Sequence, residues 1–516
     1  MLVSRKHKKL VLNLKNPERI TSIIPTAKTI EYKGTKLVAI PHRIDEVRVL
    51  RNMGIEAPSP IKYHYEWPGM YTPMSHQAET GAFLTMNPKS FVLNGMGTGK
   101  TMSVLWAFHY LQQCGEVDAA IVLGPLSTLE DTWGTEIFRN MPETNYSVVH
   151  GSVARRHKLL KDDTDVYIIN HHGILNESTL AELLALCKRK RILLIVDEIA
   201  TFRNSSTKLW KSLKKLVDAT PWTWGLTGTP IPNAPTDAWA QCKLINPGSV
   251  PKYFGAFRDQ VMRQSGPFKW VARENALDTV YRVMQPAIRY SREACIDLPP
   301  TTYQTRHVPL SPEQAKIYAE MLAKFKAEFA GGQISAINEA AKRSKLLQIC
   351  CGMAYGTSED VIIPAPERVG LVKEIIEQSE AKVIIFVPFT GALEALTAEL
   401  SKDFPVSVIH GGVSKTKRDQ IFADFRTPYG ARALLADART MAHGLNLTAA
   451  NTIVWFGPAP SNEIYEQANA RVPRPGQKLP TFIIHIEGSP VERKSYERLQ
   501  NKSTTQGILL DMFEDN

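Results

Sequence analysis

Short apolar runs recur along the chain and predict the strands of two buried sheets. In the first half they lie at residues 91–93, 120–123, 166–169, 193–196 and 223–226, separated by segments with helical patterns. A second series lies at residues 382–386, 406–409, 433–436, 451–455 and 481–484. Strands that alternate with helices are typical of doubly wound α/β sheets. We therefore predict two α/β lobes in series.

The remaining segments have different patterns. Residues 1–65 contain alternating apolar runs and a helical pattern that ends at Gly54, which predicts a small α+β module. After Leu298-Pro299-Pro300 the pattern changes to long helices at 312–330 and 334–350. A chain of 516 residues is too long for a single core. The predicted domains are residues 1–65, 66–297 and 298–516.

A glycine-rich segment follows the first apolar run. Its sequence, Asn94-Gly95-Met96-Gly97-Thr98-Gly99-Lys100-Thr101, leads into a helical pattern. Glycines in this context let backbone N–H groups surround phosphate oxygens, and the start of the helix adds further donors. We expect Lys100 to reach the β- and γ-phosphates of ATP and the Thr101 hydroxyl to bind Mg²⁺. The strict pattern has glycine at the position of Asn94, so a glycine-rich turn that binds nothing stays the alternative.

Two carboxylates, Asp197 and Glu198, follow the apolar run at 193–196. Open α/β sheets place their ligands at the carboxyl ends of such strands. Alone, an Asp-Glu pair is usually a solvated end of a loop. Because it follows the phosphate loop within one lobe, we predict that Asp197 holds Mg²⁺ and that Glu198 polarises the attacking water. ATP and Mg²⁺ are the expected cofactors.

The charge of the chain points to a polyanionic partner. The formal net charge is +11, and residues 1–65 hold eight lysines and five arginines against five acidic residues. Basic surfaces bind phosphate backbones through counterion release, which makes residues 1–65 a candidate nucleic-acid contact. No apolar stretch has membrane-spanning length, no secretory signal is visible, and the six cysteines show no metal-binding C-x-x-C spacing. We expect a cytoplasmic protein with reduced thiols.

In this order the segments resemble the superfamily-2 helicase-like ATPases and, within them, the Swi/Snf-type DNA translocases. The resemblance covers about residues 71–502, and the motifs that carry it are residues 71–77, 94–101, 122–129, 197–204 and 225–233 in the first lobe and 382–396, 410–425, 442–450 and 467–477 in the second. This family commonly has a residue other than glycine at the position of Asn94. The resemblance implies two tandem RecA-like lobes, with helical insertions at about 235–295 and 311–350.

The resemblance also implies roles for individual residues. Nucleotide contacts are implied for Gln77, Gly95, Met96, Gly97, Thr98, Gly99, Lys100, Thr101, Gly444 and Gln467. DNA contacts are implied for Ser127, Thr128, His171, Gly411, Gly412 and Asn446, and coupling between the sites for Thr227 and Thr229. Arg471 and Arg474, on the other lobe from Lys100, would supply charge to the γ-phosphate when the lobes close. For His171 a capping or solvated role is the preferred alternative.

These features predict an ATP-dependent, DNA-stimulated translocase or helicase. We expect it to act on duplex or branched DNA in replication, recombination or repair. Two alternatives stay open, a helicase acting on RNA and a non-catalytic DNA-binding scaffold that uses nucleotide as a switch. A bacterial or viral origin is favoured, and a nuclear protein is the alternative. The sequence predicts no membrane association and no particular protein partner.

Overall fold

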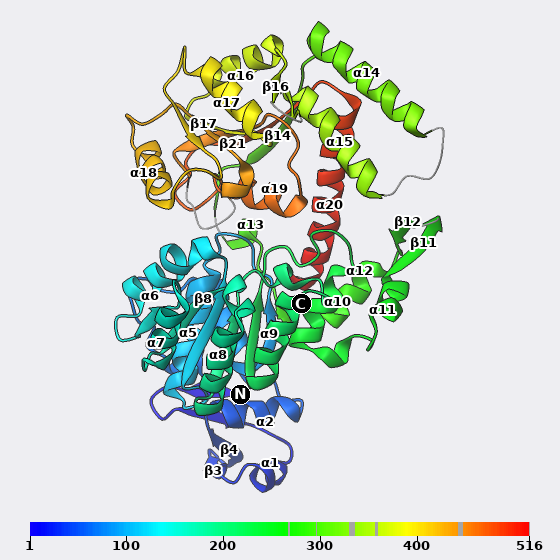
Figure 1. The fold of residues 1–516 in the computed structure, drawn as a ribbon. Helices are drawn as coiled ribbons and strands as arrows, with labels where there is room; N and C mark the ends of the chain where they lie inside the picture. Colours follow the sequence, from blue (N-terminus) through cyan, green and yellow to red (C-terminus); the bar gives the residue numbers. More distant parts are fainter. Residues whose placement is uncertain (267–268, 296, 330–335, 357–359, 442–446, 515–516) are drawn as a thin grey trace. The chain divides into compact units, whose positions relative to one another are not determined.

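The computed structural model shown in Figure 1 describes the chain except for residues 267–268, 296, 330–335, 357–359, 442–446 and 515–516. By its contacts the chain divides into two compact units. Unit 1 comprises Met1–Cys295 and Ile508–Asn516, and unit 2 comprises Ile296–Gly507. The domain limits at residues 65 and 297 stay predictions.

The N-terminal module of unit 1 is an antiparallel four-stranded sheet with two helices. Its strands lie in the order β1 (Leu2–Ser4), β2 (Lys9–Leu12), β4 (Thr35–Pro41) and β3 (Lys28–Tyr32). Alternate residues of β2 and β4 point into a small core, against helices α1 (Pro17–Ile23) and α2 (Ile44–Asn52). Gly54 follows α2 with a φ of 80°, a conformation that glycine adopts without strain. The predicted α+β module is confirmed.

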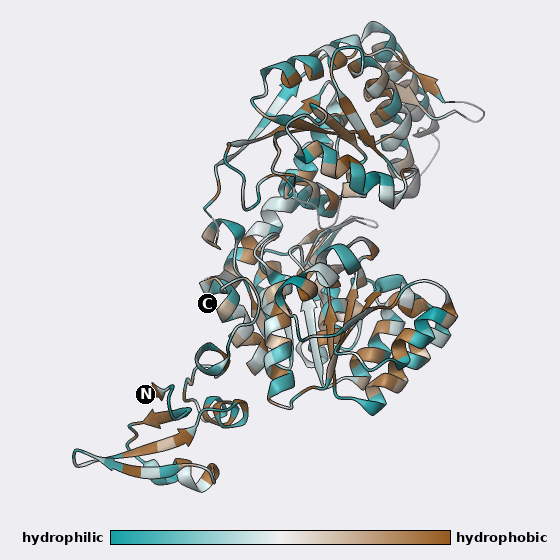
Figure 2. Ribbon diagram, turned by 90° about the vertical axis from the view of Figure 1, so that its left-hand side faces the viewer, coloured by the Kyte–Doolittle hydropathy of each residue, from teal (hydrophilic) through white to brown (hydrophobic). Residues whose placement is uncertain are grey.

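The main sheet of unit 1 has seven strands, each parallel to its neighbours. Their order is β13 (Ala287–Ile288), β5 (Lys89–Val92), β10 (Trp222–Leu226), β9 (Ile192–Val196), β6 (Ala119–Gly124), β8 (Val166–Asn170) and β7 (Tyr146–Val148). Alternate residues of β9 belong to two hydrophobic clusters, which shows that the sheet is buried on both faces. Figure 2 shows these strands as a brown centre between helices that carry teal residues.

After the N-terminal module, two helices precede β5 in the chain, and the next six each follow one strand of the main sheet. They are α3 (Ile61–His64), α4 (Ser75–Met86), α5 (Lys100–Gln113), α6 (Thr135–Asn140), α7 (Val153–Lys161), α8 (Glu177–Arg189), α9 (Lys208–Ala219) and α10 (Asp237–Ile245). Among the described residues, no helix of the chain is both long and apolar enough to cross a membrane.

The insertion of unit 1 is less purely helical than expected. It contains α11 (Phe254–Val261), the hairpin β11 (Met262–Gly266) and β12 (Lys269–Ala272), and α12 (Ala276–Val283), before β13 and α13 (Arg292–Cys295). Strand β13 returns to the main sheet and pairs with β5. The two residues of β13 are too few to leave a periodic pattern in the sequence.

Unit 2 has a second parallel sheet, of six strands. Their order is β14 (Thr301–His307), β21 (Thr481–Glu487), β20 (Ala450–Trp455), β17 (Lys382–Phe386), β19 (Ala433–Ala436) and β18 (Val406–Ile409). Two hydrophobic clusters again lie on its two faces. The predicted fold class, two tandem RecA-like lobes with insertions and a small N-terminal module, is therefore confirmed.

The helices of unit 2 include the predicted insertion. They are α14 (Pro312–Phe329), α15 (Ala336–Cys350), α16 (Pro366–Gln378), α17 (Thr390–Leu400), α18 (Lys415–Arg426), α19 (Asn462–Asn469) and α20 (Pro490–Glu514). The last residues of α20 are part of unit 1, where Leu509, Leu510 and Phe513 are buried in its core. A short hairpin, β15 (Met353–Ala354) and β16 (Val361–Ile362), precedes α16.

Candidate ATP site and nucleic-acid interface

The glycine-rich loop connects β5 to α5 and has the backbone that a phosphate cradle requires. Gly97 and Gly99 have φ values of 82° and 79°, in the left-handed region that glycine favours. Lys100 Nζ donates to the carbonyl oxygens of Asn94 at 2.8 Å and Gly95 at 3.1 Å. The ammonium group is therefore held inside the loop, where phosphate oxygens can replace the carbonyl oxygens.

Asn94, which departs from the strict loop pattern, ties the loop to two other segments. Its side chain is 1% exposed. Its Nδ2 donates to Thr80 Oγ1 on α4 at 2.9 Å, and its Oδ1 accepts the N–H of Tyr290 at 3.0 Å. A glycine at this position would make neither bond. The irregular residue thus supports the geometry of the loop.

The segment after β13 runs beside the loop, a contact that no motif in the sequence predicts. Gly95 N donates to Tyr290 O at 2.8 Å, and Arg289 Nη1 donates to Leu93 O at 2.8 Å. A Cβ on Gly95 would lie 2.9 Å from the backbone nitrogen of Arg292. Gly95 is therefore needed for close approach of two backbones. The only signal in the sequence was the basic and aromatic composition of residues 289–292.

Helix α4 places Gln77 beside the loop, as the family resemblance implied. Gln77 Oε1 accepts the N–H of Met74 at 2.9 Å, and its Nε2 donates to Thr98 O at 3.4 Å. The neighbouring His76 contacts the same oxygen through Nε2, at 2.8 Å. The start of α4 is thus bonded to the centre of the loop, so a nucleotide in the loop would lie close to Gln77.

Asp197 stands at the end of β9 with its carboxylate already oriented. Trp133 Nε1 donates to Oδ2 at 3.0 Å, and the N–H of Glu198 donates to Oδ1 at 3.1 Å. Burial raises the pKa of Asp197, while the bond from Trp133 and the charge of Lys100 lower it. Lys100 is therefore near enough to affect the charge of Asp197, which supports the prediction that loop and carboxylate serve one site. Trp133 follows the motif at 122–129 in the chain, but its bond to Asp197 joins residues 64 positions apart and could not be predicted from the sequence.

Glu198 has a strained backbone and contacts the motif at residues 225–233. Its φ is 50°, which is uncommon for a residue with a side chain and is typical of functional sites. The Thr227 hydroxyl donates to Glu198 Oε2 at 3.4 Å, and Thr229 N donates to Thr227 Oγ1 at 3.1 Å. Thr227 and Thr229, at the end of β10, therefore connect to the carboxylate predicted to polarise water.

The residues of unit 1 that are expected to contact DNA differ in their hydrogen bonds. His171 is 5% exposed, its Nε2 donates to Asp197 O at 2.8 Å, and burial lowers its pKa to about 4. The burial of His171 contradicts the solvated alternative, and its bond to the Asp197 carbonyl oxygen is compatible with the capping alternative. The Thr128 hydroxyl donates to Pro125 O at 3.0 Å, within a short 3-10 helix that also includes Ser127. Their contact with DNA stays a prediction.

In unit 2, Gly411 and Gly412 are exposed directly after β18, and Gly412 N donates to His410 Nδ1 at 3.2 Å. Exposed backbone at a strand end is compatible with a phosphate contact. Asn446 and Gly444 lie outside the described residues.

The predicted arginines of unit 2 lie just after α19. Arg471 is 4% exposed, and its carbonyl oxygen accepts the N–H of Leu447 at 3.1 Å. Arg474 Nε donates to Ala470 O at 3.0 Å. Gln467, on α19, is buried in the same region. One backbone bond and one side-chain bond thus order this segment, and the roles of its three polar residues in ATP binding and hydrolysis stay predictions.

The donor groups beside the loop fit a magnesium ion. Asp197 offers a carboxylate and Thr101 a hydroxyl, the hard oxygen ligands that Mg²⁺ prefers together with phosphate oxygens. A Cβ on Gly97 would meet no heavy atom within 4 Å, so the loop leaves space for phosphate. The residues present therefore fit the predicted cofactors.

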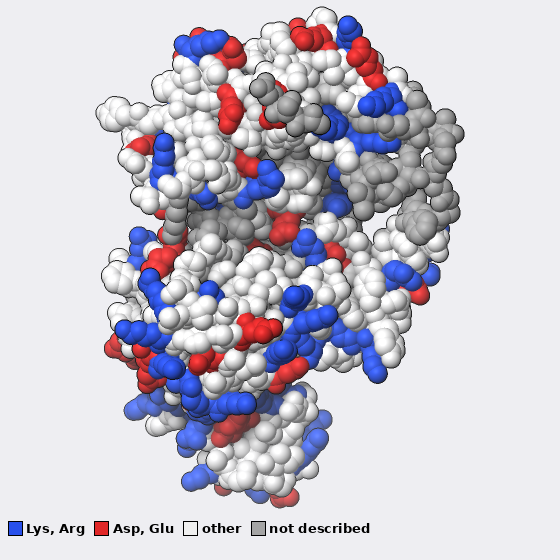
Figure 3. All heavy atoms as spheres, viewed as in Figure 1, with Lys and Arg blue, Asp and Glu red and all other residues white. Residues whose placement is uncertain are grey.

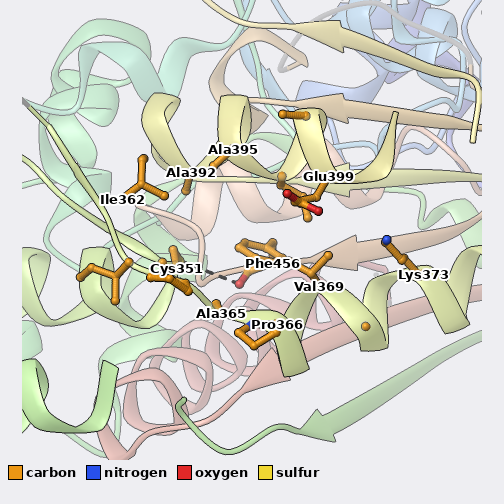
Figure 4. Close-up of a pocket in the computed structure, with 16 residues that line it drawn as sticks. Cys351, Ile362, Ala365, Pro366, Val369, Lys373, Ala392, Ala395, Glu399 and Phe456 are labelled. Carbon is orange, nitrogen blue, oxygen red and sulfur yellow. Dashed lines mark hydrogen bonds between the residues drawn. The ribbon is translucent and has the colours of Figure 1, made fainter. Parts of the chain in front are cut away.

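A separate pocket of about 580 Å³ lies in unit 2 between α16 and α17 (Figure 4). Its lining is mainly apolar, with Phe456 and Cys351 on one side and Lys373 and Glu399 near its end. Among the described residues, none of those predicted for the ATP or DNA sites lines it. This pocket is distinct from the candidate site.

Together, the parallel sheet, the phosphate loop and the strand-end carboxylates define a RecA-like ATPase lobe, followed by a second lobe of the same kind. A model of the SNF2-related domain matches residues 84–353, and a model of the helicase conserved C-terminal domain matches residues 367–476. The chain belongs to the SNF2-related family, which confirms its identification as a Swi/Snf-type superfamily-2 ATPase.

Similar proteins come from several kingdoms. The chain is 26% identical over 435 residues to the putative ATP-dependent helicase/translocase YwqA of Bacillus subtilis, which covers 79% of this chain and 45% of that protein. It is 25% identical over 533 residues to the Arabidopsis thaliana protein CHROMATIN REMODELING 5, and the match covers 95% of this chain and 29% of that protein. The chain therefore spans less than half the length of these relatives. The solved structure of the Sulfolobus solfataricus SWI2/SNF2 ATPase core in complex with dsDNA is 22% identical to this chain, with a TM-score of 0.42. The match covers 87% of this chain and 95% of that one.

Proposed function

We propose that this protein hydrolyses ATP when bound to DNA and uses the energy to move along or remodel duplex DNA. The observation that carries the proposal is the arrangement of three strand ends at one edge of the sheet. The phosphate loop follows β5, Thr227 follows β10, and Asp197 and Glu198 follow β9, and these strands are neighbours in the order β5-β10-β9. Loop, coupling residue and carboxylates thus share one edge.

Each of these residues has a distinct task in the proposed reaction. Lys100 binds the β- and γ-phosphate oxygens, and Glu198 orients a water molecule and accepts its proton. Bound Mg²⁺, held by Thr101 and Asp197, would neutralise charge on the phosphates. Arg471 and Arg474 would add positive charge to the transferring phosphoryl group, a role for which planar guanidinium groups are suited.

We propose DNA as the track because the chain carries a net positive charge and because of the names that similar proteins carry. The net charge is +11. Figure 3 shows Lys and Arg gathered over the N-terminal module and the adjoining part of unit 1. The similar proteins are named as a helicase/translocase and as a chromatin-remodelling protein. We propose that Ser127, Thr128, Gly411, Gly412 and Asn446 contact the DNA backbone and that the N-terminal module favours branched substrates, consistent with a role in replication, recombination or repair.

Displacement of a triplex-forming strand from duplex DNA tests the movement directly. We expect displacement that requires ATP, and stimulation of hydrolysis that is greater with duplex DNA than with RNA. Stimulation by RNA alone would support an RNA helicase instead. ATP binding without turnover under all conditions would support a nucleotide-switched scaffold.

The preference for branched DNA needs a separate test. Reversing the charges of Lys28, Lys33 and Lys36 on the exposed β3–β4 hairpin should weaken binding to forked DNA more than binding to linear duplex. Equal loss on both substrates would contradict the proposed role of the module.

A further inference from the structure

A polar pocket of about 670 Å³ opens on the insertion of unit 1. It lies between the end of α11, the segment that follows β12, and α12. Among the described residues, none to which a nucleotide or DNA role was assigned lines this pocket. Its chemistry is therefore separate from the motifs considered above.

Two arginines line the pocket, and both are held by bonds that use one edge of the guanidinium group. Arg273 Nε donates to the carbonyl oxygens of Asp259 at 2.9 Å and Met262 at 3.1 Å. Arg282 Nε donates to Asp278 O at 3.3 Å, and its Nη2 to Thr279 Oγ1 at 3.5 Å. Within the described chain, both Nη groups of Arg273 and Nη1 of Arg282 keep their N–H donors for a ligand. The arginines are thus preorganised to receive an oxyanion.

The carboxylates around the pocket leave it positively charged. Asp259 lines the pocket, but its Oδ1 accepts bonds from Arg258 at 3.1 Å and 3.0 Å, which pairs its charge. Glu274 and Asp278 are exposed neighbours in the chain that do not line the pocket. The two arginines therefore face no unpaired carboxylate in the lining.

Two amide side chains add neutral donors. Gln260 and Asn275 line the pocket and are exposed. Asn275 is the N-cap residue of α12 but makes no capping bond through its side chain. Its amide is therefore available to a ligand. Guanidinium forks with nearby amides are donors that match the several oxygens of a phosphate group.

We propose that this pocket binds a phosphate group and that the ligand is a backbone phosphate of the DNA on which the ATPase acts. This proposal rests on the proposed function. A free nucleotide offers the same phosphate chemistry, but no aromatic side chain is among the described lining residues, so its base would have no stacking partner. The insertion also carries the exposed cations Lys252 and Arg263 outside the pocket, which have the same charge as the two arginines and serve as their comparison.

The double variant Arg273→Ala/Arg282→Ala tests the proposal in the full chain. We expect its affinity for duplex DNA to fall about tenfold, and the slope of log affinity against log salt concentration to become shallower by about 1, because one phosphate contact is lost. ATP hydrolysis without DNA should not change. The matched control is Lys252→Ala/Arg263→Ala, which removes the same charge from the same insertion outside the pocket, and it should have a much smaller effect. Equal losses in the two variants would overturn the proposal.

A conservative variant and a small probe separate the remaining possibilities. Arg273→Lys/Arg282→Lys keeps the charge but removes the forks, so it should recover the salt slope and only part of the affinity. Inorganic phosphate, titrated into the wild-type protein, should bind in competition with duplex DNA. If phosphate binds and the double variant keeps full DNA affinity, the pocket serves a free phosphate, and the assignment to DNA is overturned. If the wild-type protein neither binds DNA nor is stimulated by it, the proposed function and this assignment both fail, and the failure is visible before any variant is made.

Discussion

The two lobes have the same sheet topology but different chemistry at their strand ends. Six strands of unit 1, β5-β10-β9-β6-β8-β7, correspond in order and direction to β14-β21-β20-β17-β19-β18 of unit 2. In unit 1 the first of these strands is followed by the phosphate loop. In unit 2 it is followed by Val308-Pro309-Leu310-Ser311, without glycine, before α14 begins. One scaffold thus occurs twice, and the sequence after the strand decides whether it can hold phosphate.

The same contrast holds at the neighbouring strand ends. Strand β9 is followed by Asp197-Glu198, whereas its counterpart β20 is followed by Phe456-Gly457. Unit 2 therefore lacks the carboxylates at this position and carries its candidate catalytic charge as arginines after α19. The comparison teaches that a RecA-like sheet provides positions for ligands, while a few residues at its carboxyl edge provide the reaction.

Glu198→Gln should have a large effect on ATP hydrolysis and almost none on ATP binding. The amide keeps the shape of the side chain but cannot accept a proton, so hydrolysis should fall by about 10²- to 10⁴-fold. Binding of a fluorescent ATP analogue should be retained, because Lys100 and the loop are unchanged. Stopped-flow binding and steady-state turnover measure the two quantities. Hydrolysis close to the wild-type rate would remove Glu198 from its assigned role.

Asn94→Ala tests whether the irregular residue of the loop supports nucleotide binding. It loses two buried bonds, each worth about 1 kcal/mol, so the KM for ATP should rise about tenfold or more, with a smaller effect on kcat. Asn94→Asp keeps the acceptor for Tyr290 N, so its KM for ATP should lie between those of the wild type and Asn94→Ala. Thr80→Val removes the acceptor for Asn94 Nδ2, so its KM for ATP should also be intermediate. An unchanged KM in Asn94→Ala would show that the loop is held by its own backbone.

Trp133→Phe should have a smaller effect, acting through Asp197. The substitution removes a bond of about 1 to 1.5 kcal/mol from a carboxylate, so turnover should fall by roughly 5- to 10-fold and require more Mg²⁺. The matched control is Trp210→Phe, which also loses a partly buried indole bond, to Ala240 O at 2.9 Å, away from the site. If the two variants have equal magnesium requirements, the bond to Asp197 does not act on the metal site.

Acidification should lower the stability of both units against unfolding, because each contains a buried histidine. Burial lowers the pKa of His171 in unit 1 and of His485 in unit 2 to about 4. Between about pH 6.5 and pH 4 the unfolded chain binds more protons than the folded one, so stability falls as the pH falls, by up to about 1.4 kcal/mol per pH unit for each histidine. Urea unfolding at pH 7 and pH 5 measures this loss, and substitution of the exposed His7 is the control. Equal midpoints at the two pH values would contradict it.

The central strands could be predicted because burial on both faces leaves continuous apolar runs, as at β9 and β17. Strands β7 and β13 are too short to leave such a run, and β14 is a polar edge strand whose residues are mostly exposed. For this reason the sequence predicts no strand between Pro300 and the helix at 312, where the structure has β14.

Site residues were predictable to the extent that their chemistry is local. The phosphate loop and the Asp197-Glu198 pair are contiguous motifs, so their spacing identified them. The bonds from Trp133 to Asp197 and from Asn94 to Tyr290 join segments 64 and 196 residues apart. Such contacts depend on the order of strands in the sheet, which the pattern of a single chain does not specify.

The central claim is that duplex DNA controls ATP turnover at the site built around Lys100. Its most direct test is the steady-state rate of ATP hydrolysis with and without duplex DNA, in the wild-type protein and in Lys100→Ala. We predict clear stimulation by DNA in the wild type and the loss of hydrolysis in the variant under both conditions. A wild-type rate that does not change on addition of DNA, or a variant that hydrolyses ATP as fast as the wild type, would contradict it.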